Sequence, residues 1–190
     1  MSMIISVGIY ALFVMASTFL PFFSFEGYSI FSNTTSHLGA QSSPHGWIMN
    51  MVFMLLGIRS IYICLKTRIP HIQFIGTIFA TSLILTGLFK HGPIVEGVPI
   101  NLQEDMLHSV FATATGFSFS LLAIGHGIMS RSSQRIVSLA VSSVALLIPL
   151  LMISYPSYAG ISQRFMFISA FFWLFFCFQP DARYKLKGRP

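Results

Sequence analysis

The chain has 190 residues, of which 54% are hydrophobic and 8% are charged, and its formal net charge is +6. Average soluble domains carry about 25% charged residues, so this composition excludes an ordinary soluble globule and a disordered chain. Such a low share of charged residues also argues against nucleic-acid binding. The mean hydropathy of +0.76 is typical of a polytopic membrane protein.

Six segments approach the roughly 20 apolar residues that a helix needs to cross a hydrocarbon core. They lack the alternation of membrane-barrel strands, and backbone groups in lipid must be hydrogen-bonded within their own segment. The sequence therefore predicts an all-α, six-helix bundle that forms one transmembrane domain over residues 1–190. The first segment lacks a basic start and a clear cleavage site, so we expect it to be retained. The predicted spans are residues 4–23, 47–65, 72–89, 106–129, 136–153 and 161–178.

Lysine and arginine gather in every second connection, as they do in cytoplasmic loops. This distribution predicts that both termini are cytoplasmic, including a basic tail over 179–190, and that loops 24–46, 90–105 and 154–164 face outward. The expected location is the inner or plasma membrane. Arg59, near the end of the second span, is expected to extend toward the cytoplasm, with a buried partner as the alternative. The clustered cations are Lys66, Arg68, Arg131, Arg135, Arg183, Lys185, Lys187 and Arg189.

Two acids and a histidine open the fourth predicted span. Glu104, Asp105 and His108 are three and four residues apart, so they share one helix face. In one interpretation the acids favourably cap the helix dipole and His108 is an interfacial histidine. In the other, Asp105 or Glu104 orients His108 in an outer-face pocket, because ionisable groups in a membrane face protein or water. The small residues that follow are predicted to pack against another helix; they are Ser109, Ala112, Thr113, Gly116 and Ser120.

Four further polar residues are expected on the same outer side. Ser36 and His37 lie in the first outer loop, Asn50 lies about one turn inside the second span, and Arg164 opens the sixth. We expect Arg164 to pair with Glu104 or Asp105 across the bundle. The predicted ligand-binding residues are therefore Ser36, His37, Asn50, Glu104, Asp105, His108 and Arg164.

The motif around the first outer loop resembles a known family. An Asn-Thr-Thr-Ser-x-Leu-Gly run over residues 33–39 is followed by Pro44 and, later, by Asp105 and His108 at the start of a helix. This pattern is similar to the uncharacterised bacterial membrane family called domain of unknown function 998, and also to Frag/DRAM-type membrane proteins. The sequence departs from the family's Ser-Asp-Leu-Gly-like element at His37, where an acid is expected. The resemblance implies a multi-pass membrane protein and no established reaction.

Three functions remain open on the sequence. The first is a non-enzymatic bundle whose outer-face pocket binds a lipid headgroup or other small ligand in transport, sensing or immunity. Its partners would be the bilayer and that ligand, with no nucleic acid. The second is a zinc-dependent intramembrane hydrolase, although neither His-x-x-x-His nor His-Glu-x-x-His occurs. Its predicted metal ligands are His37, His91, Asp105 and His108.

The third function is a b-type electron carrier with two haems. His108 and His126 are 18 residues apart, which is five helical turns, so they share a face near opposite ends of one helix. His71 is expected at the inner level, and His45 or His91 at the outer level, where they would supply the second axial ligands. Serine-hydrolase chemistry has less support, because Gly-x-Ser-x-Gly is absent.

Overall fold

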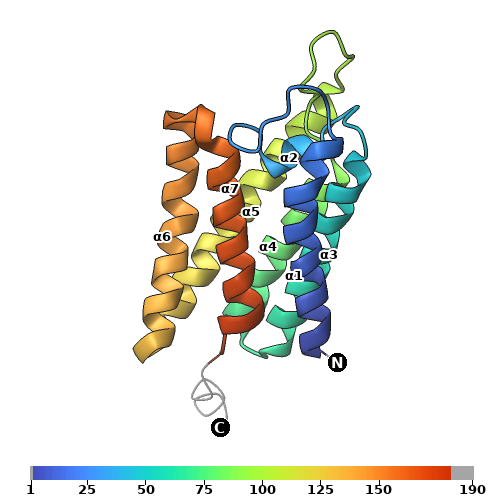
Figure 1. Cartoon of the computed structure of the whole chain (residues 1–190). Helices are drawn as coiled ribbons and strands as arrows, with labels where there is room; N and C mark the ends of the chain where they lie inside the picture. Colours follow the sequence, from blue (N-terminus) through green and yellow to red (C-terminus); the bar gives the residue numbers. More distant parts are fainter. Residues whose placement is uncertain (1, 181–190) are drawn as a thin grey trace.

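The computed structural model describes residues 2–180, and six of its helices are long and apolar enough to cross a membrane (Figure 1). No strand occurs in this part of the chain, so the predicted all-α, six-span fold is confirmed. The elements are α1 (Ser2–Phe19), η1 (Leu20–Phe23), α2 (Thr35–Leu38), α3 (Gly46–Lys66), α4 (Pro70–Leu88), α5 (Leu102–Met129), α6 (Ser132–Ser154), η2 (Pro156–Tyr158), α7 (Ala159–Phe172) and the π-helical turn η3 (Trp173–Cys177).

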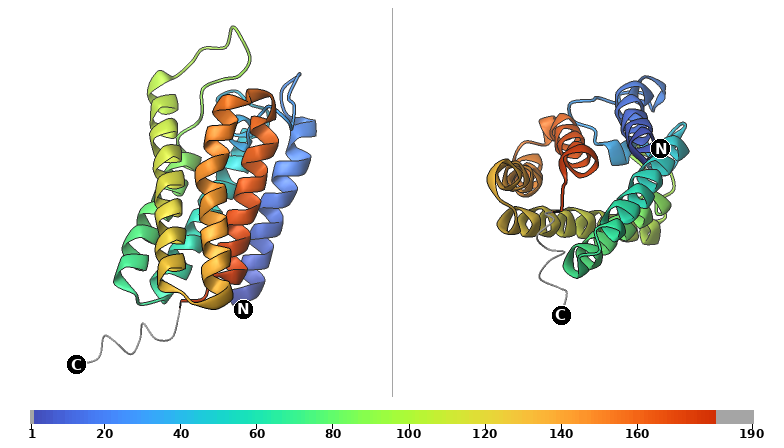
Figure 2. Two further views of the ribbon diagram at one scale, coloured as in Figure 1. Left: turned by 90° about the vertical axis from the view of Figure 1, so that its left-hand side faces the viewer. Right: turned by 90° about the horizontal axis from the view of Figure 1, so that it is seen from below.

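The six long helices form a ring. Each packs on the next one in the chain, and α1 closes the ring by contacting both α3 and α7 (Figure 2). The chain enters α1 and leaves η3 at one end of the bundle, and the short helix α2 lies at the other, which we call the α2 end (Figure 1). The basic tail predicted over 179–190 lies outside the described residues beyond Pro180. Which end faces the cytoplasm stays a prediction.

The tightest helix contact joins α3 and α4. A Cβ atom added to Gly57 would meet the carbonyl oxygen of Ala80, and one added to Gly87 would meet the carbonyl oxygen of Asn50. Glycine lets two backbones approach closely where lipid gives no hydrophobic drive for helix association. This contact anchors the half of the ring that lies opposite α6.

Helix α5 begins earlier than predicted, at Leu102, and has 28 residues. The side chain of Asn101 caps it by accepting the backbone N–H of Glu104 at 3.1 Å. At 1.5 Å per residue α5 is about 42 Å long, against a hydrocarbon thickness of about 30 Å. Because its first turn carries Glu104 and Asp105, we expect the excess length to extend beyond the apolar layer at this end.

Arg59 does not extend toward water, which makes that prediction wrong and the alternative of a buried partner correct. Its side chain is 8% exposed, and its Nε donates to the Ser6 hydroxyl at 2.9 Å. The guanidinium also lies over the ring of Tyr62, 4.9 Å from the centroid. A hydroxyl from α1 and an aromatic face one turn along α3 therefore keep this cation inside the bundle.

Candidate functional site

Three histidines from different elements lie side by side at the α2 end. The ring centroids of His37 and His91 are 5.0 Å apart, and those of His91 and His108 are 5.4 Å apart. His37 is supplied by α2, His91 by the loop after α4, and His108 by the second turn of α5. We call these three side chains the histidine cluster. Three histidines that were predicted from the sequence to lie on the same side of the membrane are therefore next to one another in the structure.

The hydrogen bonds around the cluster fix where its protons lie. Nδ1 of His37 is 3.3 Å from the backbone N–H of Thr34, which can only donate, so the neutral His37 ring carries its proton on Nε2. Nδ1 of His108 lies 3.0 and 2.9 Å from the carbonyl oxygens of Thr86 and Phe89, so that nitrogen donates. The backbone thereby sets opposite tautomers in His37 and His108, the two rings that flank His91.

Asp105 orients the loop before α5 rather than His108. Its Oδ1 accepts the backbone N–H of Gly92 at 2.6 Å and lies 3.9 Å from Nδ1 of His91. His108 is held instead by the two carbonyl oxygens at the end of α4. The prediction that an acid orients His108 is therefore wrong. Asp105 points toward the loop before α5, whereas His108, one turn later, points toward α4. The carboxylate of Glu104 has no partner within residues 2–180.

The pKa of His37 is lowered from 6.5 to about 4, mainly by burial and in smaller part by the nearby His91, Arg164 and His108. The folded protein therefore disfavours the proton that the unfolded chain takes up near pH 6.5. The stability that His37 contributes is complete above pH 6.5 and is lost as the pH falls toward 4.

We expect the thermal midpoint of the wild type in mild detergent to fall relative to that of His37→Gln between pH 6.5 and 4, because only the wild type must protonate this buried ring. The exposed His45 provides the control, and His45→Asn should run parallel to the wild type over the whole range. A constant difference between wild type and His37→Gln would contradict the assignment.

Arg164 is held by backbone and not by an acid, which overturns the predicted pairing with Glu104 or Asp105. Its side chain is 5% exposed. Five contacts within hydrogen-bond distance surround it, at 2.6 to 3.1 Å, and all lead to neutral oxygens. The acceptors are the carbonyl oxygens of Ser17, Ile30, Asn33 and Gly160 and the hydroxyl of Tyr28. Arg164 therefore joins α1, the first connecting loop and α7.

Asn50 joins α2 to α3. Its Nδ2 donates to the carbonyl oxygen of Gly39 at 3.0 Å, and its side chain is 6% exposed. Gly39 ends α2 with a φ of −94°, an angle that any residue can adopt. Glycine is therefore required here because there is no room for a side chain. A Cβ there would lie on the Asn50 amide. Asn50 is therefore a structural tie beneath the α2 segment and does not reach the histidine cluster by a hydrogen bond.

The predicted metal ligands are neighbours, but their arrangement does not support a metal site. In the described part of the chain, no group of three or more His, Cys, Asp or Glu side chains is placed to hold a metal ion. The zinc-hydrolase hypothesis therefore stays a prediction without geometric support.

The inner haem of the two-haem hypothesis loses its ligand. Nδ1 of His126 lies 2.8 Å from the Ser138 hydroxyl, and its Nε2 lies 3.0 Å from the carbonyl oxygen of Gln179. Its ring is also packed 4.7 Å from that of Phe178, centroid to centroid. One ring nitrogen therefore contacts α6 and the other contacts the backbone after η3, so both already have protein partners.

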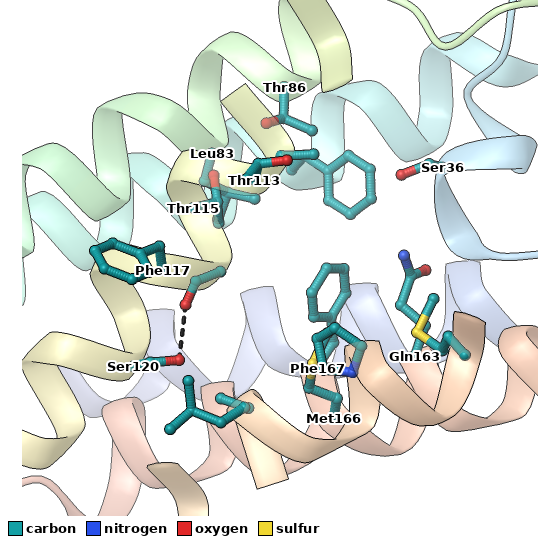
Figure 3. Close-up of a pocket in the computed structure, with 17 residues that line it drawn as sticks. Ser36, Leu83, Thr86, Thr113, Thr115, Phe117, Ser120, Gln163, Met166 and Phe167 are labelled. Carbon is teal, nitrogen blue, oxygen red and sulfur yellow. Dashed lines mark hydrogen bonds between the residues drawn. The ribbon is translucent and has the colours of Figure 1, made fainter. Parts of the chain in front are cut away.

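A cavity of about 450 Å³ lies between α5, α6 and α7, and one end of it reaches Ser36 on α2 (Figure 3). Four of the five small residues predicted to pack against a helix line this space instead: Ala112, Thr113, Gly116 and Ser120. A Cβ added to Gly116 would meet nothing within 4 Å. The stripe therefore creates a void, which corrects the packing prediction, since small side chains at helical spacing are equally suited to leaving room.

Most of the cavity wall is apolar. Aromatic, aliphatic and methionine side chains from α3 to α7 make up the larger part of it, and none of the seventeen lining residues is charged. Phe117 and Leu146 line the cavity and are also 65% and 45% exposed. These two side chains therefore border both the cavity and the outer surface of the bundle, within the length that crosses the bilayer. Of the lining residues, only Ser36 was predicted from the sequence to belong to a site.

The six long apolar helices define a polytopic α-helical membrane protein. Over residues 6–178 the chain matches the model of the family described as "Protein of unknown function (DUF998)", and it belongs to that family. The family predicted from the first outer loop is thus confirmed. No curated protein and no solved structure matches the chain, and the resemblance to Frag/DRAM-type proteins has no counterpart in these comparisons.

Proposed function

We propose that this protein binds an amphipathic membrane lipid, with the lipid chain in the cavity and its polar group at the α2 end. The observation that carries the proposal is an apolar cavity of about 450 Å³ inside the spans. Ligand pockets typically measure about 300–1,000 Å³ and are mostly apolar with a few polar groups. Side chains that line an empty space lack van der Waals contacts on that side. An apolar chain that fills the cavity supplies those contacts and so stabilises the site.

The position of the cavity wall supports a ligand that arrives from the bilayer between α5 and α6. Phe117 on α5 and Leu146 on α6 border both the cavity and the outside of the bundle. At that depth the surroundings are lipid chains and not water. A lipid chain can therefore pass from the bilayer into the cavity without leaving apolar surroundings. A water-soluble ligand would have to enter the hydrocarbon layer first. With the α2 end outward, as the distribution of cations predicts, the bound polar group lies toward the outer leaflet.

Filling the cavity should abolish lipid binding. We expect Gly116→Leu to lower the amount of lipid that co-purifies in mild detergent at least tenfold, because the new side chain projects into open space where the lipid chain would lie. Lipid bound to the purified protein is measured by native mass spectrometry and by lipid extraction.

Gly125→Leu is the matched control for this experiment. Gly125 is also on α5 and also has nothing within 4 Å of an added Cβ, but it does not line the cavity. We expect Gly125→Leu to retain the lipid of the wild type. Equal lipid content in Gly116→Leu and the wild type would refute the proposed function.

A further inference from the structure

One hydroxyl in the cavity differs from the others. Thr86, Thr113, Thr115 and Ser120 each donate to the carbonyl oxygen four residues earlier in their own helix, at 2.8 or 2.9 Å, a local bond that is common for such residues within helices. The hydroxyl of Ser36 donates to no atom of residues 2–180, although the residue is only 8% exposed. Ser36 therefore presents an unpartnered donor to the cavity.

A second donor faces Ser36 from α7. Oε1 of Gln163 accepts both the backbone N–H and the hydroxyl of Thr35, at 2.8 and 2.6 Å. Because a backbone N–H can only donate, this contact fixes the amide orientation and leaves Nε2 on the opposite side. Figure 3 shows that nitrogen turned toward Ser36 at one end of the cavity. Its two N–H groups have no acceptor within the described residues.

The charge around this pair favours a neutral ligand group. No charged residue lines the cavity, and Arg164, one residue after Gln163, directs its guanidinium to protein oxygens. An ionised carboxylate or phosphate buried here would lose its hydration without gaining a counter-charge. Two donors without an accompanying cation instead match a neutral carbonyl oxygen.

We propose that Ser36 and Gln163 form a subsite for the uncharged acyl carbonyl of a single-chain ester or amide lipid. This inference rests on the proposed function and names its ligand class. If a methylene occupies about 30 Å³, as a water does in the liquid, the cavity holds about fifteen of them, which is one chain and not two. A monoacylglycerol with a chain of about sixteen carbons has both features: one chain and a neutral ester carbonyl at its polar end.

The test compares monopalmitoylglycerol with its ether analogue, hexadecylglycerol, which lacks only the carbonyl oxygen. Both are titrated by native mass spectrometry into the full-length protein, and free palmitate serves as the anionic competitor. We expect the wild type to bind the ester about tenfold more tightly than the ether, and more tightly than palmitate, since one good hydrogen bond from a buried donor contributes up to about tenfold in affinity. Ser36→Ala should lose most of this preference, because only the Gln163 amide then remains as a donor to the ester carbonyl.

Ser120→Ala is the matched control, because Ser120 lines the same cavity but already donates to Gly116. This variant should keep the preference for the ester. Ser36→Ala removes a hydroxyl that has no protein partner, so its thermal midpoint should equal that of the wild type. Gln163→Glu retains an acceptor for Thr35 but replaces the donors by an oxygen, and we expect it to weaken ester binding further.

The outcomes separate this inference from the proposed function. Suppose that Gly116→Leu blocks lipid binding. The subsite alone would then be overturned if the wild type showed no preference for the ester, or if Ser36→Ala left that preference unchanged. Tighter binding of palmitate than of the ester would also overturn it. If Gly116→Leu leaves lipid binding unchanged, the cavity is not the binding site and both proposals fail.

Discussion

Replacing Arg164 by leucine is expected to destabilise the protein by at least about 3 kcal/mol, because a hydrogen bond to a charged group contributes about 1.5–3 kcal/mol and Arg164 makes several. The guanidinium is the donor for four carbonyl oxygens and for the hydroxyl of Tyr28. Each buried acceptor that loses its donor costs further free energy. Since these acceptors come from α1, the first loop and the start of α7, the variant should lose the α2 end before the rest of the bundle.

Tryptophan fluorescence during thermal unfolding in mild detergent measures this effect, because Trp173 is 1% exposed in the core. Arg131→Leu is the control: Arg131 is exposed between α5 and α6, and exposed substitutions usually change stability by less than about 0.5 kcal/mol. Arg164→Lys keeps the charge but has no planar fork, so it should lie between the wild type and Arg164→Leu. An unchanged midpoint in Arg164→Leu would mean that backbone contacts alone hold the loop.

The spans were predictable because lipid imposes one strong requirement on sequence. Each spanning helix must be long and apolar and must satisfy its own backbone, so the six segments were found from hydropathy alone, within a few residues. The start of α5 was missed because Asn101 caps the helix with polar residues outside the apolar run. Hydropathy indicates which residues of a helix lie in lipid, whereas the capping residue indicates where the helix itself begins.

The candidate site was less predictable, because its residues carry no periodic signal. The charges of Arg164, Glu104 and Asp105 suggested an ion pair. Four of the five acceptors of Arg164 are instead backbone carbonyl oxygens, which every sequence has. Gln163 is a candidate site residue only because the backbone N–H of Thr35 fixes the orientation of its amide, a contact between residues far apart in the sequence. Small residues at helical spacing fit either a packed interface or a void, and only the placement of α6 and α7 decides which.

Gly39→Ala is expected to cost about 2–4 kcal/mol, although it adds a single methyl group. The new Cβ would lie on the side-chain amide of Asn50, which is buried and donates to the Gly39 carbonyl oxygen. Moving that amide breaks the tie between α2 and α3 and leaves a buried polar group unsatisfied. Because Ser36 lies on α2, the same variant should also lose the ester preference of the cavity.

A double-mutant cycle separates the collision from other effects. Asn50→Ala removes the obstructing amide, so Gly39→Ala should cost much less in that background than in the wild type, which would give a coupling energy of at least about 1 kcal/mol. Gly8→Ala is the control, because an added Cβ there has nothing within 4 Å, and alanine at that helical position should be neutral or slightly stabilising. Additive costs in the cycle would show that Gly39 is needed for a reason other than the approach of Asn50, and α2 would then lack the support that the Ser36 subsite requires.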